Sequence, residues 1–328
     1  MIAMVRIFGR IVVGILPIMP KFLVGKFSKR YVAGATIDDA VKVMKNLANE
    51  NACFTIDVLG EEISNLDEAQ YFIDEYNRVL DAIVENNLDA NISVKPTAFG
   101  LLIDEEIAYK SIEKLLKKAA ESEIFIRLDM EDYRVTQVTL DIALKMHERG
   151  LTNVGVVIQA RMFRTKEDIE NLVSQLGGAA DVRICKGIYL ESEKIAHTKY
   201  QGIVDALNQS VDQLLDSGAY AAIASHDLPV IDYSLKALKK RKMGPNTPDP
   251  RENAGPPRPH KGAGYEFQML LGVRGNIRRK LAAQGHLTRI YIPYGSRWYE
   301  YGMRRLRENP DIAWHVTKSI LMPWTNRK

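Results

Sequence analysis

Polar and charged residues end most of the apolar runs that the sequence predicts to be β-strands. In an α/β barrel the carboxyl ends of the parallel strands meet at one mouth, where side chains from different strands can act on one ligand. Because unpaired charges are costly to bury, we interpret this convergence as a ligand-binding site, with a purely structural ion-pair network as the alternative. The strand-end residues are Asp57, Glu61, Lys95, Asp129, Gln159, Arg183, Lys186, Ser225, His226, Tyr291 and Tyr294.

A second set of candidate ligand-binding residues lies in a predicted helix over residues 297–308. Tyr301, Arg304, Arg305 and Glu308 share one helical face, because their spacing is i, i+3, i+4 and i+7. Two arginines on one face suit a carboxylate or a phosphate, since a guanidinium can donate to two oxygens at once. A solvated basic stripe is the alternative, against which Glu308 argues because a nearby acid can orient the arginines.

Short apolar runs alternate with longer amphipathic runs, which indicates parallel strands joined by crossover helices. We predict strands over residues 53–59, 90–96, 124–130, 154–160, 182–187, 221–227, 265–270 and 288–294. The intervening helices are predicted over residues 62–85, 104–120, 135–149, 166–176, 195–215 and 232–240. Eight strands favour a closed barrel, although the count also allows an open doubly wound sheet. A nucleotide-binding Rossmann unit is disfavoured, because the stretch 262–267 lacks the third glycine of its fingerprint and precedes a strand.

The length of 328 residues accommodates one barrel of about 250 residues with an N-terminal extension. We therefore predict a helical extension over residues 1–50 and a single catalytic barrel over residues 51–328. Within the extension, a capping box at Thr36 and Asp39 predicts a helix over residues 37–48. Residues 16–27 mix apolar side chains with lysines, which is typical of an amphipathic helix packed on the barrel or lying on a membrane surface.

The composition argues against several classes of function. The two cysteines and six histidines show no metal-ligand spacing, so we predict reduced thiols and no metal site. The net charge of +4 is too small to indicate a nucleic-acid-binding protein by itself. Basic residues do concentrate in the C-terminal quarter, where they suit RNA, anionic lipid or a small anionic substrate, or form a solvated helix face. These residues are Arg274, Arg278, Arg279, Lys280, Arg289, Arg297, Arg304, Arg305 and Arg307.

The motifs at the strand ends resemble those of the proline dehydrogenase family, in order and over about residues 30–325. The matching strings are DVLGE at 57–61, KPT at 95–97, DMEDY at 129–133, RICKGIY at 183–189, YEFQML at 265–270, YIPYG at 291–295 and YEYGMRRLRE at 299–308. The resemblance implies an α/β fold, namely a distorted (β/α)8 TIM-like barrel that holds FAD non-covalently. It also implies the monofunctional activity: L-proline is oxidised to 1-pyrroline-5-carboxylate by hydride transfer to flavin N5, the first step of proline catabolism to glutamate, and a membrane quinone accepts the electrons.

The resemblance implies roles for individual residues. Asp129 and Arg183 match catalytic residues. The substrate-binding residues would be Glu61, Lys95, Tyr291, Arg304 and Arg305, with Lys95 and the two arginines on the proline carboxylate and Tyr291 beside the pyrrolidine ring. The cofactor-binding residues would be Gln159, Arg183, Lys186, Gly187, Ile188, Ser225 and His226, with Gln159 and Arg183 at the flavin ring.

The remaining expectations concern location, partners and rival functions. We expect a cytoplasmic protein without a nucleic-acid partner, with peripheral contact at the inner face of a membrane as an alternative. The oligomeric state stays open, with a homo-oligomer among the alternatives. Two other functions fit parts of the pattern: a Schiff-base aldolase that uses Lys95 or Lys186, and RNA binding through the basic C-terminal quarter.

Overall fold

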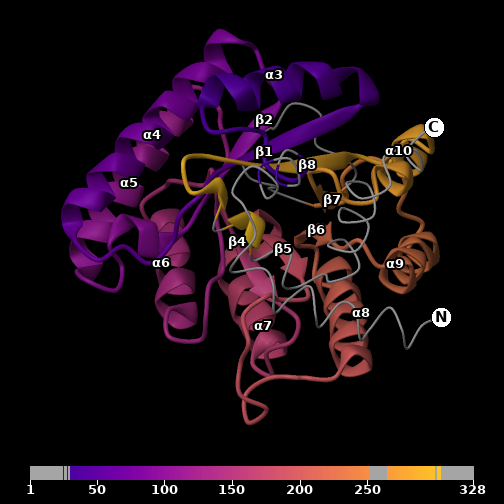
Figure 1. Ribbon diagram of the computed structural model, residues 1–328. Helices are drawn as coiled ribbons and strands as arrows, with labels where there is room; N and C mark the ends of the chain where they lie inside the picture. Colours follow the sequence, from indigo (N-terminus) through magenta and orange to yellow (C-terminus); the bar gives the residue numbers. More distant parts are fainter. Residues whose placement is uncertain (1–24, 26–27, 29, 252–263, 300, 304–328) are drawn as a thin grey trace, which may run out of the picture.

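The computed structural model describes residues 25, 28, 30–251, 264–299 and 301–303. Eight parallel strands form a closed barrel in chain order, because β8 pairs with β1 as well as with β7 (Figure 1). The strands are β1 (Ala52–Val58), β2 (Ala90–Val94), β3 (Ile126–Leu128), β4 (Val154–Gln159), β5 (Asp181–Cys185), β6 (Tyr220–Ala224), β7 (Tyr265–Leu270) and β8 (Thr288–Tyr294). The predicted barrel is confirmed, and the alternative of an open sheet is wrong.

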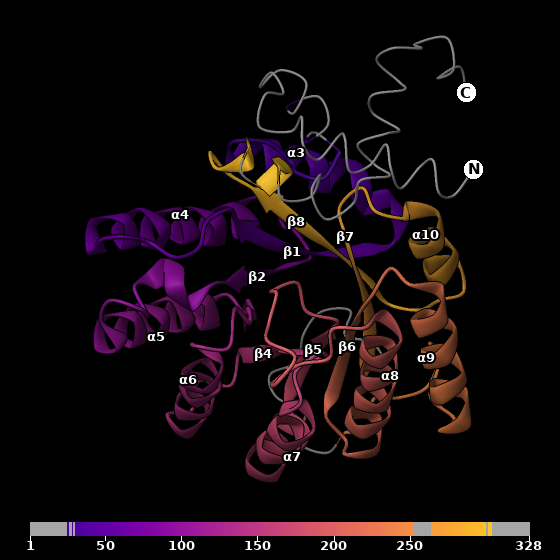
Figure 2. The ribbon, with the colours of Figure 1, turned by 60° about the horizontal axis from the view of Figure 1, so that its bottom comes forward.

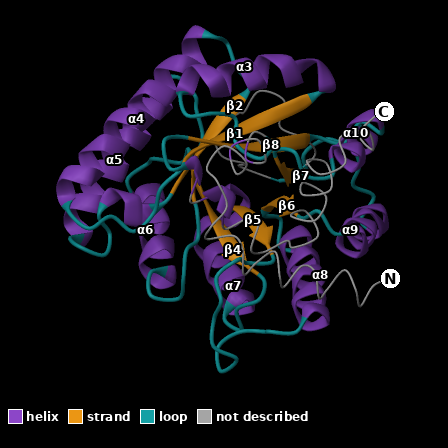
Figure 3. Cartoon of the chain, viewed as in Figure 1, coloured by secondary structure: helices purple, strands orange, loops and turns teal. Residues whose placement is uncertain are grey.

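Helices connect successive strands and form a ring outside the barrel (Figure 3). They are α4 (Leu66–Glu85), α5 (Glu105–Glu121), α6 (Thr136–Glu148), α7 (Thr165–Leu176), α8 (Tyr200–Asp216), α9 (Leu228–Lys240) and α10 (Gly275–Ala283). Short 3-10 helices are η2 (Ala48–Glu50), η3 (Pro96–Phe99) and η4 (Gly177–Ala179). Because each helix returns the chain to the same end of the barrel, the carboxyl ends of all the strands share one mouth.

Successive side chains of a strand alternate between the helix-facing and the barrel-facing side, and here many of the barrel-facing ones are polar or charged. On β5, Val182 and Ile184 belong to the hydrophobic core, whereas Arg183 between them reaches across the interior to β7. Barrel interiors are usually filled by branched aliphatic side chains. Here the interior instead holds the ion pairs Arg127–Asp181, Arg183–Asp129 and Arg289–Glu266.

Helix α3 (Ile37–Leu47) precedes β1 and packs on β1 and β8, where the barrel closes (Figure 2). Its predicted capping box is confirmed: the Thr36 hydroxyl accepts a hydrogen bond from the Asp39 N–H at 3.3 Å, and the Asp39 carboxylate accepts from the Thr36 N–H at 3.1 Å. In a regular barrel a helix after β8 would take this place. Here residues 298–299 and 301–303 after β8 are helical, and Tyr301 among them lines a cavity at the mouth. The barrel therefore departs from the regular form, since α3 occupies the outer position beside β8.

The predicted helices differ from the structure mainly at their first residues. Helix α4 begins at Leu66 instead of residue 62, because Asn65 accepts a hydrogen bond from the Glu68 N–H as its cap. Helix α8 begins at Tyr200 instead of residue 195, because Ala196 forms an isolated β-bridge with the loop after β4. Both N-termini are therefore decided by local hydrogen bonds that an apolar repeat does not reveal.

Helix α10 is not predicted by the sequence pattern. Of its nine residues only Arg278 and Leu281 are buried, so it carries no apolar stripe. Arg278 pairs with Glu50, and Arg289 is buried inside the barrel. Part of the basic C-terminal quarter is therefore occupied by internal ion pairs, which weakens its interpretation as an RNA-binding surface.

Some expectations fall outside the part of the chain that the structure describes. These are nearly all of the amphipathic segment 16–27 and residues 304–308 of the last predicted helix. The helices that the structure describes contain no apolar stretch of the length that a membrane-spanning helix requires. Among the described residues, no group of three or more His, Cys, Asp or Glu side chains could hold a metal ion.

Gly155 on β4 adjoins the buried Arg127–Asp181 pair. A Cβ atom at this position would lie 2.5 Å from the Asp181 carbonyl oxygen and 3.2 Å from Arg127 Nη1. We expect Gly155→Ala to lower the free energy of unfolding by about 2 kcal/mol, because a close-packed interior cannot accept a methyl group without moving the backbone. Urea unfolding measures the change. Gly244→Ala is the control, since a Cβ there meets nothing within 4 Å; equal stabilities of the two variants would contradict the prediction.

Candidate active site

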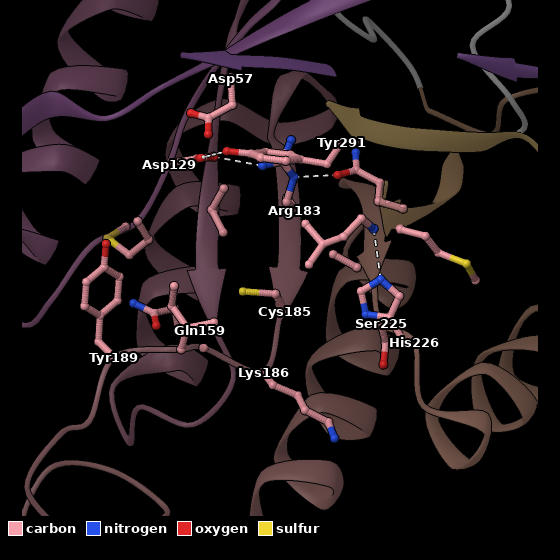
Figure 4. Close-up of a pocket in the computed structure, with 18 of the residues that line it drawn as sticks. Asp57, Asp129, Gln159, Arg183, Cys185, Lys186, Tyr189, Ser225, His226 and Tyr291 are labelled. Carbon is pink, nitrogen blue, oxygen red and sulfur yellow. Dashed lines mark hydrogen bonds and ion pairs between the residues drawn. The ribbon is translucent and has the colours of Figure 1, made fainter. Parts of the chain in front are cut away.

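A cavity of about 390 Å³ lies at the carboxyl ends of the strands (Figure 4). Side chains from or just after all eight strands contribute to its lining. Ten of the thirteen residues assigned to a site by resemblance line it: Lys95, Asp129, Gln159, Arg183, Lys186, Gly187, Ile188, Ser225, His226 and Tyr291. Residues far apart in the sequence are thus brought together around one space large enough for a small ligand.

Arg183 on β5 is held by residues from four other strands or their ends, of which Figure 4 labels Asp129 and Tyr291. Its Nη1 donates to Asp129 Oδ1 at 2.8 Å and to Ser93 Oγ at 3.1 Å, and its Nε donates to Gln268 Oε1. The Tyr291 hydroxyl donates to the other Asp129 oxygen at 2.6 Å, and the Arg183 guanidinium carbon lies 5.2 Å from the centre of the Tyr291 ring. The guanidinium therefore has little freedom to turn.

Lys95, which directly follows β2, lies between two carboxylates. Its Nζ is 2.6 Å from Asp57 Oδ1 and 3.7 Å from Asp129 Oδ2. Burial lowers the pKa of Lys95, but attraction to the two carboxylates outweighs burial and leaves the pKa above its ordinary value. Burial raises the pKa of Asp57 to about 6, against the opposing effect of Lys95. Lys95 is therefore a cation at neutral pH, which suits an anionic ligand and disfavours the Schiff-base alternative, since that chemistry needs a neutral amine.

Two buried polar atoms of cavity residues have no hydrogen-bond partner among the described residues. They are Arg183 Nη2, which can only donate, and Gln159 Oε1, which can only accept. Gln159 is held in place, because its Nε2 donates to the Glu131 carbonyl oxygen at 2.7 Å. Buried polar groups in folded proteins are nearly always paired. This donor and this acceptor therefore indicate a ligand that offers both kinds of partner.

The side of the cavity near β5 and β6 carries a second polar group of residues. Lys186 donates to the Asp227 carboxylate, and its Nζ lies 4.4 Å from the centre of the Tyr200 ring. The Tyr200 hydroxyl donates to the same carboxylate at 3.1 Å. His226 Nε2 accepts from the Leu270 N–H at 2.9 Å, so the neutral imidazole carries its proton on Nδ1. These polar side chains at the edge of the cavity suit a part of the ligand that carries anionic or hydroxyl groups.

The turn after β5 brings backbone close to the cavity. Gly187 has a φ of 93°, and a Cβ there would lie 2.6 Å from Gln159 Oε1, so both the conformation and the contact favour glycine. Ile188 lines the cavity and is 47% exposed. On the neighbouring strand end, Ser225 Oγ accepts from the Asp227 N–H at 3.2 Å. These segments present backbone and a hydroxyl where a ligand can approach closely.

Glu61 does not line the cavity but is connected to it. The hydroxyl of Tyr189, which lines the cavity, donates to Glu61 Oε2 at 3.0 Å. Arg304 and Arg305 lie outside the described residues. Their substrate role, and that of Glu61 as their partner, therefore stay predictions.

Three residues without an individual role in the sequence analysis prove central to the geometry. Asp57 binds Lys95, and Gln268 binds Arg183. Glu131 accepts hydrogen bonds from the backbone N–H of Thr97, at 3.0 Å, and from the Thr97 hydroxyl. Asp57 and Gln268 occupy barrel-facing positions of their strands, and this alternation is the signal that could have identified them.

The chain matches known proteins along most of its length. A family model described as "Proline dehydrogenase" matches residues 40–318. A protein named "Proline dehydrogenase 1" from Bacillus subtilis subsp. natto is 34% identical over 295 residues, which cover 90% of each chain. "Proline dehydrogenase" from Deinococcus radiodurans is 29% identical over 298 residues, again 90% of each chain.

A solved structure shares the fold. Proline utilization A (PutA) from Bdellovibrio bacteriovorus, inactivated by N-propargylglycine, superposes with a TM-score of 0.76 at 22% identity. The match covers 87% of this chain and 33% of that one, so this chain spans about a third of PutA. At this low identity the likeness concerns the barrel fold alone.

The buried carboxyl of Glu131 predicts a pH dependence of stability. Burial raises its pKa from 4.5 to about 7, so between these values the folded protein holds a proton that the unfolded chain has released. The free energy of unfolding should therefore fall as the pH rises through this range. In Glu131→Gln, whose amide can still accept from the Thr97 N–H, this contribution is absent.

Urea unfolding of both proteins across this range checks the prediction. We expect the wild type to lose about 3 kcal/mol relative to the variant, since the shift spans about 2.5 pKa units and one unit corresponds to about 1.4 kcal/mol. Asp57, whose pKa is also raised, is present in both proteins and cancels in the comparison. A constant difference between the two proteins would contradict the raised pKa of Glu131.

Proposed function

The chain belongs to the proline dehydrogenase family of oxidoreductases, and from this premise we propose that it oxidises L-proline to 1-pyrroline-5-carboxylate with FAD bound non-covalently in the barrel cavity. One observation carries the proposal: Lys95, Asp129, Arg183 and Tyr291, from four different strands or their ends, form one cluster of hydrogen bonds and ion pairs at the cavity. Such a fixed charged cluster can hold a zwitterionic amino acid in one orientation, which is the main requirement for a reaction between bound partners.

The unpaired atoms of Arg183 and Gln159 support a flavin as the group that completes the cavity. The isoalloxazine ring offers carbonyl oxygens and ring nitrogens that can accept from an arginine and donate to an amide oxygen. Lys186, Ser225 and His226 would hold the phosphate and ribose parts, because a cation and hydrogen-bonding side chains suit these groups. When bound, FAD would supply the hydride acceptor that no side chain can provide.

The substrate carboxylate needs cations beyond those that the structure describes in the cavity. Each described cation there already has a carboxylate partner: Lys95 with Asp57, Arg183 with Asp129 and Lys186 with Asp227. Arg304 and Arg305 would supply the additional charge, with Lys95 beside them and Tyr291 against the pyrrolidine ring. Cations around the bound amine also favour its neutral form, from which the hydride leaves.

A membrane quinone is the electron acceptor that we propose, for a cytoplasmic protein that contacts the inner face of a membrane peripherally. Apolar side chains at the mouth support this part of the proposal. Ile188, which lines the cavity, is 47% exposed, and Leu190, two residues further along the same loop, is 95% exposed. An apolar electron acceptor that approaches the mouth could therefore contact apolar side chains there.

An absorbance spectrum of the purified protein, recorded without oxygen before and after addition of L-proline, tests the function. We expect flavin bands that bleach with L-proline, because the flavin becomes reduced. D-proline is the matched control and should leave the bands unchanged. With the opposite configuration, its carboxylate cannot bind the cations while its ring packs against Tyr291. A flavin spectrum that L-proline does not alter would reject the substrate and keep the cofactor. Absence of flavin, even after reconstitution with FAD, would reject the whole proposal.

The carboxylate role of Arg305 is tested by Arg305→Lys. We expect the KM for L-proline to rise about ten-fold or more, because lysine cannot donate to both carboxylate oxygens in the fork geometry of arginine. Arg279→Lys on α10 is the control. The Arg279 side chain is 57% exposed, and its ion pair with Glu50 is long, at 3.7 Å. Steady-state kinetics measure both variants. An unchanged KM in Arg305→Lys would remove Arg305 from the substrate site.

A further inference from the structure

The orientation of Arg183 depends on a residue outside the carboxylate cluster. Its Nη1 is engaged by Asp129 and Ser93, and its Nε donates to Gln268 Oε1 on β7. Strand β6 lies between β5 and β7, but the register partner of Gln268 on β6 is Ala224, whose small side chain leaves room for this contact. Nε and Nη1 of the guanidinium are thus both held by hydrogen bonds. Because the group is planar, these two atoms also fix the position of the unpaired Nη2.

The amide of Gln268 can be oriented in only one way. Its Nε2 donates to Glu266 Oε1 and its Oε1 accepts from Arg183 Nε. Burial alone would raise the pKa of Glu266, but Arg289 outweighs it and brings the pKa to about 2, so Glu266 is a carboxylate that can only accept. The Arg183 Nε–H can only donate. If the amide were flipped, its NH2 group would face the Arg183 Nε–H, which is also a donor, and its oxygen would face the Glu266 carboxylate, which is also an acceptor.

Glu266 itself is fixed by residues from two neighbouring strands. Arg289 on β8 donates to it from Nε at 2.8 Å and from Nη2 at 3.1 Å, and the Tyr220 hydroxyl on β6 donates at 3.0 Å. Arg289 in turn donates to the Phe54 carbonyl oxygen on β1 at 2.8 Å. The Glu266–Arg289 pair is buried and anchored to the backbone, so it gives Gln268 a rigid base.

We propose that Gln268 is a positioning residue, which transmits the fixed geometry of the Glu266–Arg289 pair to Arg183 and thereby sets the direction in which Arg183 meets the flavin. The inference rests on the proposed function, because the flavin is the partner assigned there to Arg183. An uncharged residue that donates on one side and accepts on the other is required at this position. A carboxylate would repel Glu266, and an apolar side chain would leave Arg183 Nε without an acceptor.

Gln268→Met tests the proposal, with Tyr220→Phe as the matched control. Each change removes one hydrogen bond to Glu266, but only the first also releases Arg183. The readouts are the FAD dissociation constant, from quenching of flavin fluorescence on titration of the apoprotein, and kcat with L-proline. We expect Gln268→Met to weaken FAD binding about ten-fold, as for one lost hydrogen bond, and to lower kcat at least ten-fold. Tyr220→Phe should change each quantity by less than about two-fold, because Arg289 still holds Glu266.

A second variant covers the case in which Gln268→Met does not fold. In Gln268→Glu, a protonated carboxyl group reproduces the amide, since its O–H donates to Glu266 and its carbonyl oxygen accepts from Arg183. The ratio of its FAD dissociation constant to that of the wild type should fall towards one as the pH is lowered from about 8 to about 6. The charged groups around this position are Arg183 and Glu266, which it contacts, Arg289 beside it, and behind these Asp129 and Arg127; His226 at the same cavity is common to both proteins.

The outcomes separate the inference from the function. Wild type that binds no FAD would remove the proposed function, and the inference with it. Wild type that binds FAD, together with a Gln268→Met variant equal to Tyr220→Phe in FAD affinity and kcat, would leave the function standing and overturn the positioning role. If only Gln268→Glu folds, a ratio that does not change with pH would overturn it as well.

Discussion

Each arginine buried inside this barrel depends on a carboxylate that is buried with it. Arg127, Arg183 and Arg289 pair with Asp181, Asp129 and Glu266, and all six are less than a tenth exposed. Removal of one member would leave an uncompensated charge, at a cost of about 3–5 kcal/mol. The buried arginines also need space: Gly155 adjoins the Arg127–Asp181 pair, and Ala224 leaves room for the contact between Arg183 and Gln268. A polar interior thus dictates both the large and the small residues of the strands.

This interior is also what makes the site rigid. The partners of Arg183 come from strands or from residues that directly follow them. One of them, Gln268, is itself hydrogen-bonded to the buried Glu266–Arg289 pair. Sites built on strands hold their geometry more closely than sites built on loops. Loops contribute mainly at the mouth, where Gly187 and Ile188 border the cavity. Positioning and access are therefore supplied by different parts of the barrel.

The sequence predicts the strands well because alternation and strand–helix order are local properties. It also identifies Arg183 and Asp129, which lie in motifs that resemble a known family. It does not predict what these residues touch: Arg183 and Gln268 are 85 residues apart and meet because the closed sheet places them at one height. Helix α10 escapes prediction for another reason, since its buried residues include the charged Arg278 in place of an apolar stripe.

The closure of the barrel beneath α3 bears on how the protein is made. Ala52 at the start of β1 pairs with Thr288 at the start of β8. Of the barrel strands β1 is synthesised first and β8 last, so this pairing cannot form until the barrel is almost fully synthesised. Contacts between such distant segments form slowly, and until then one edge of β1 is unpaired. Unpaired strand edges invite association with other chains. Nascent or truncated chains that end before β8 should therefore be the species most dependent on chaperones, although the finished barrel has no edge.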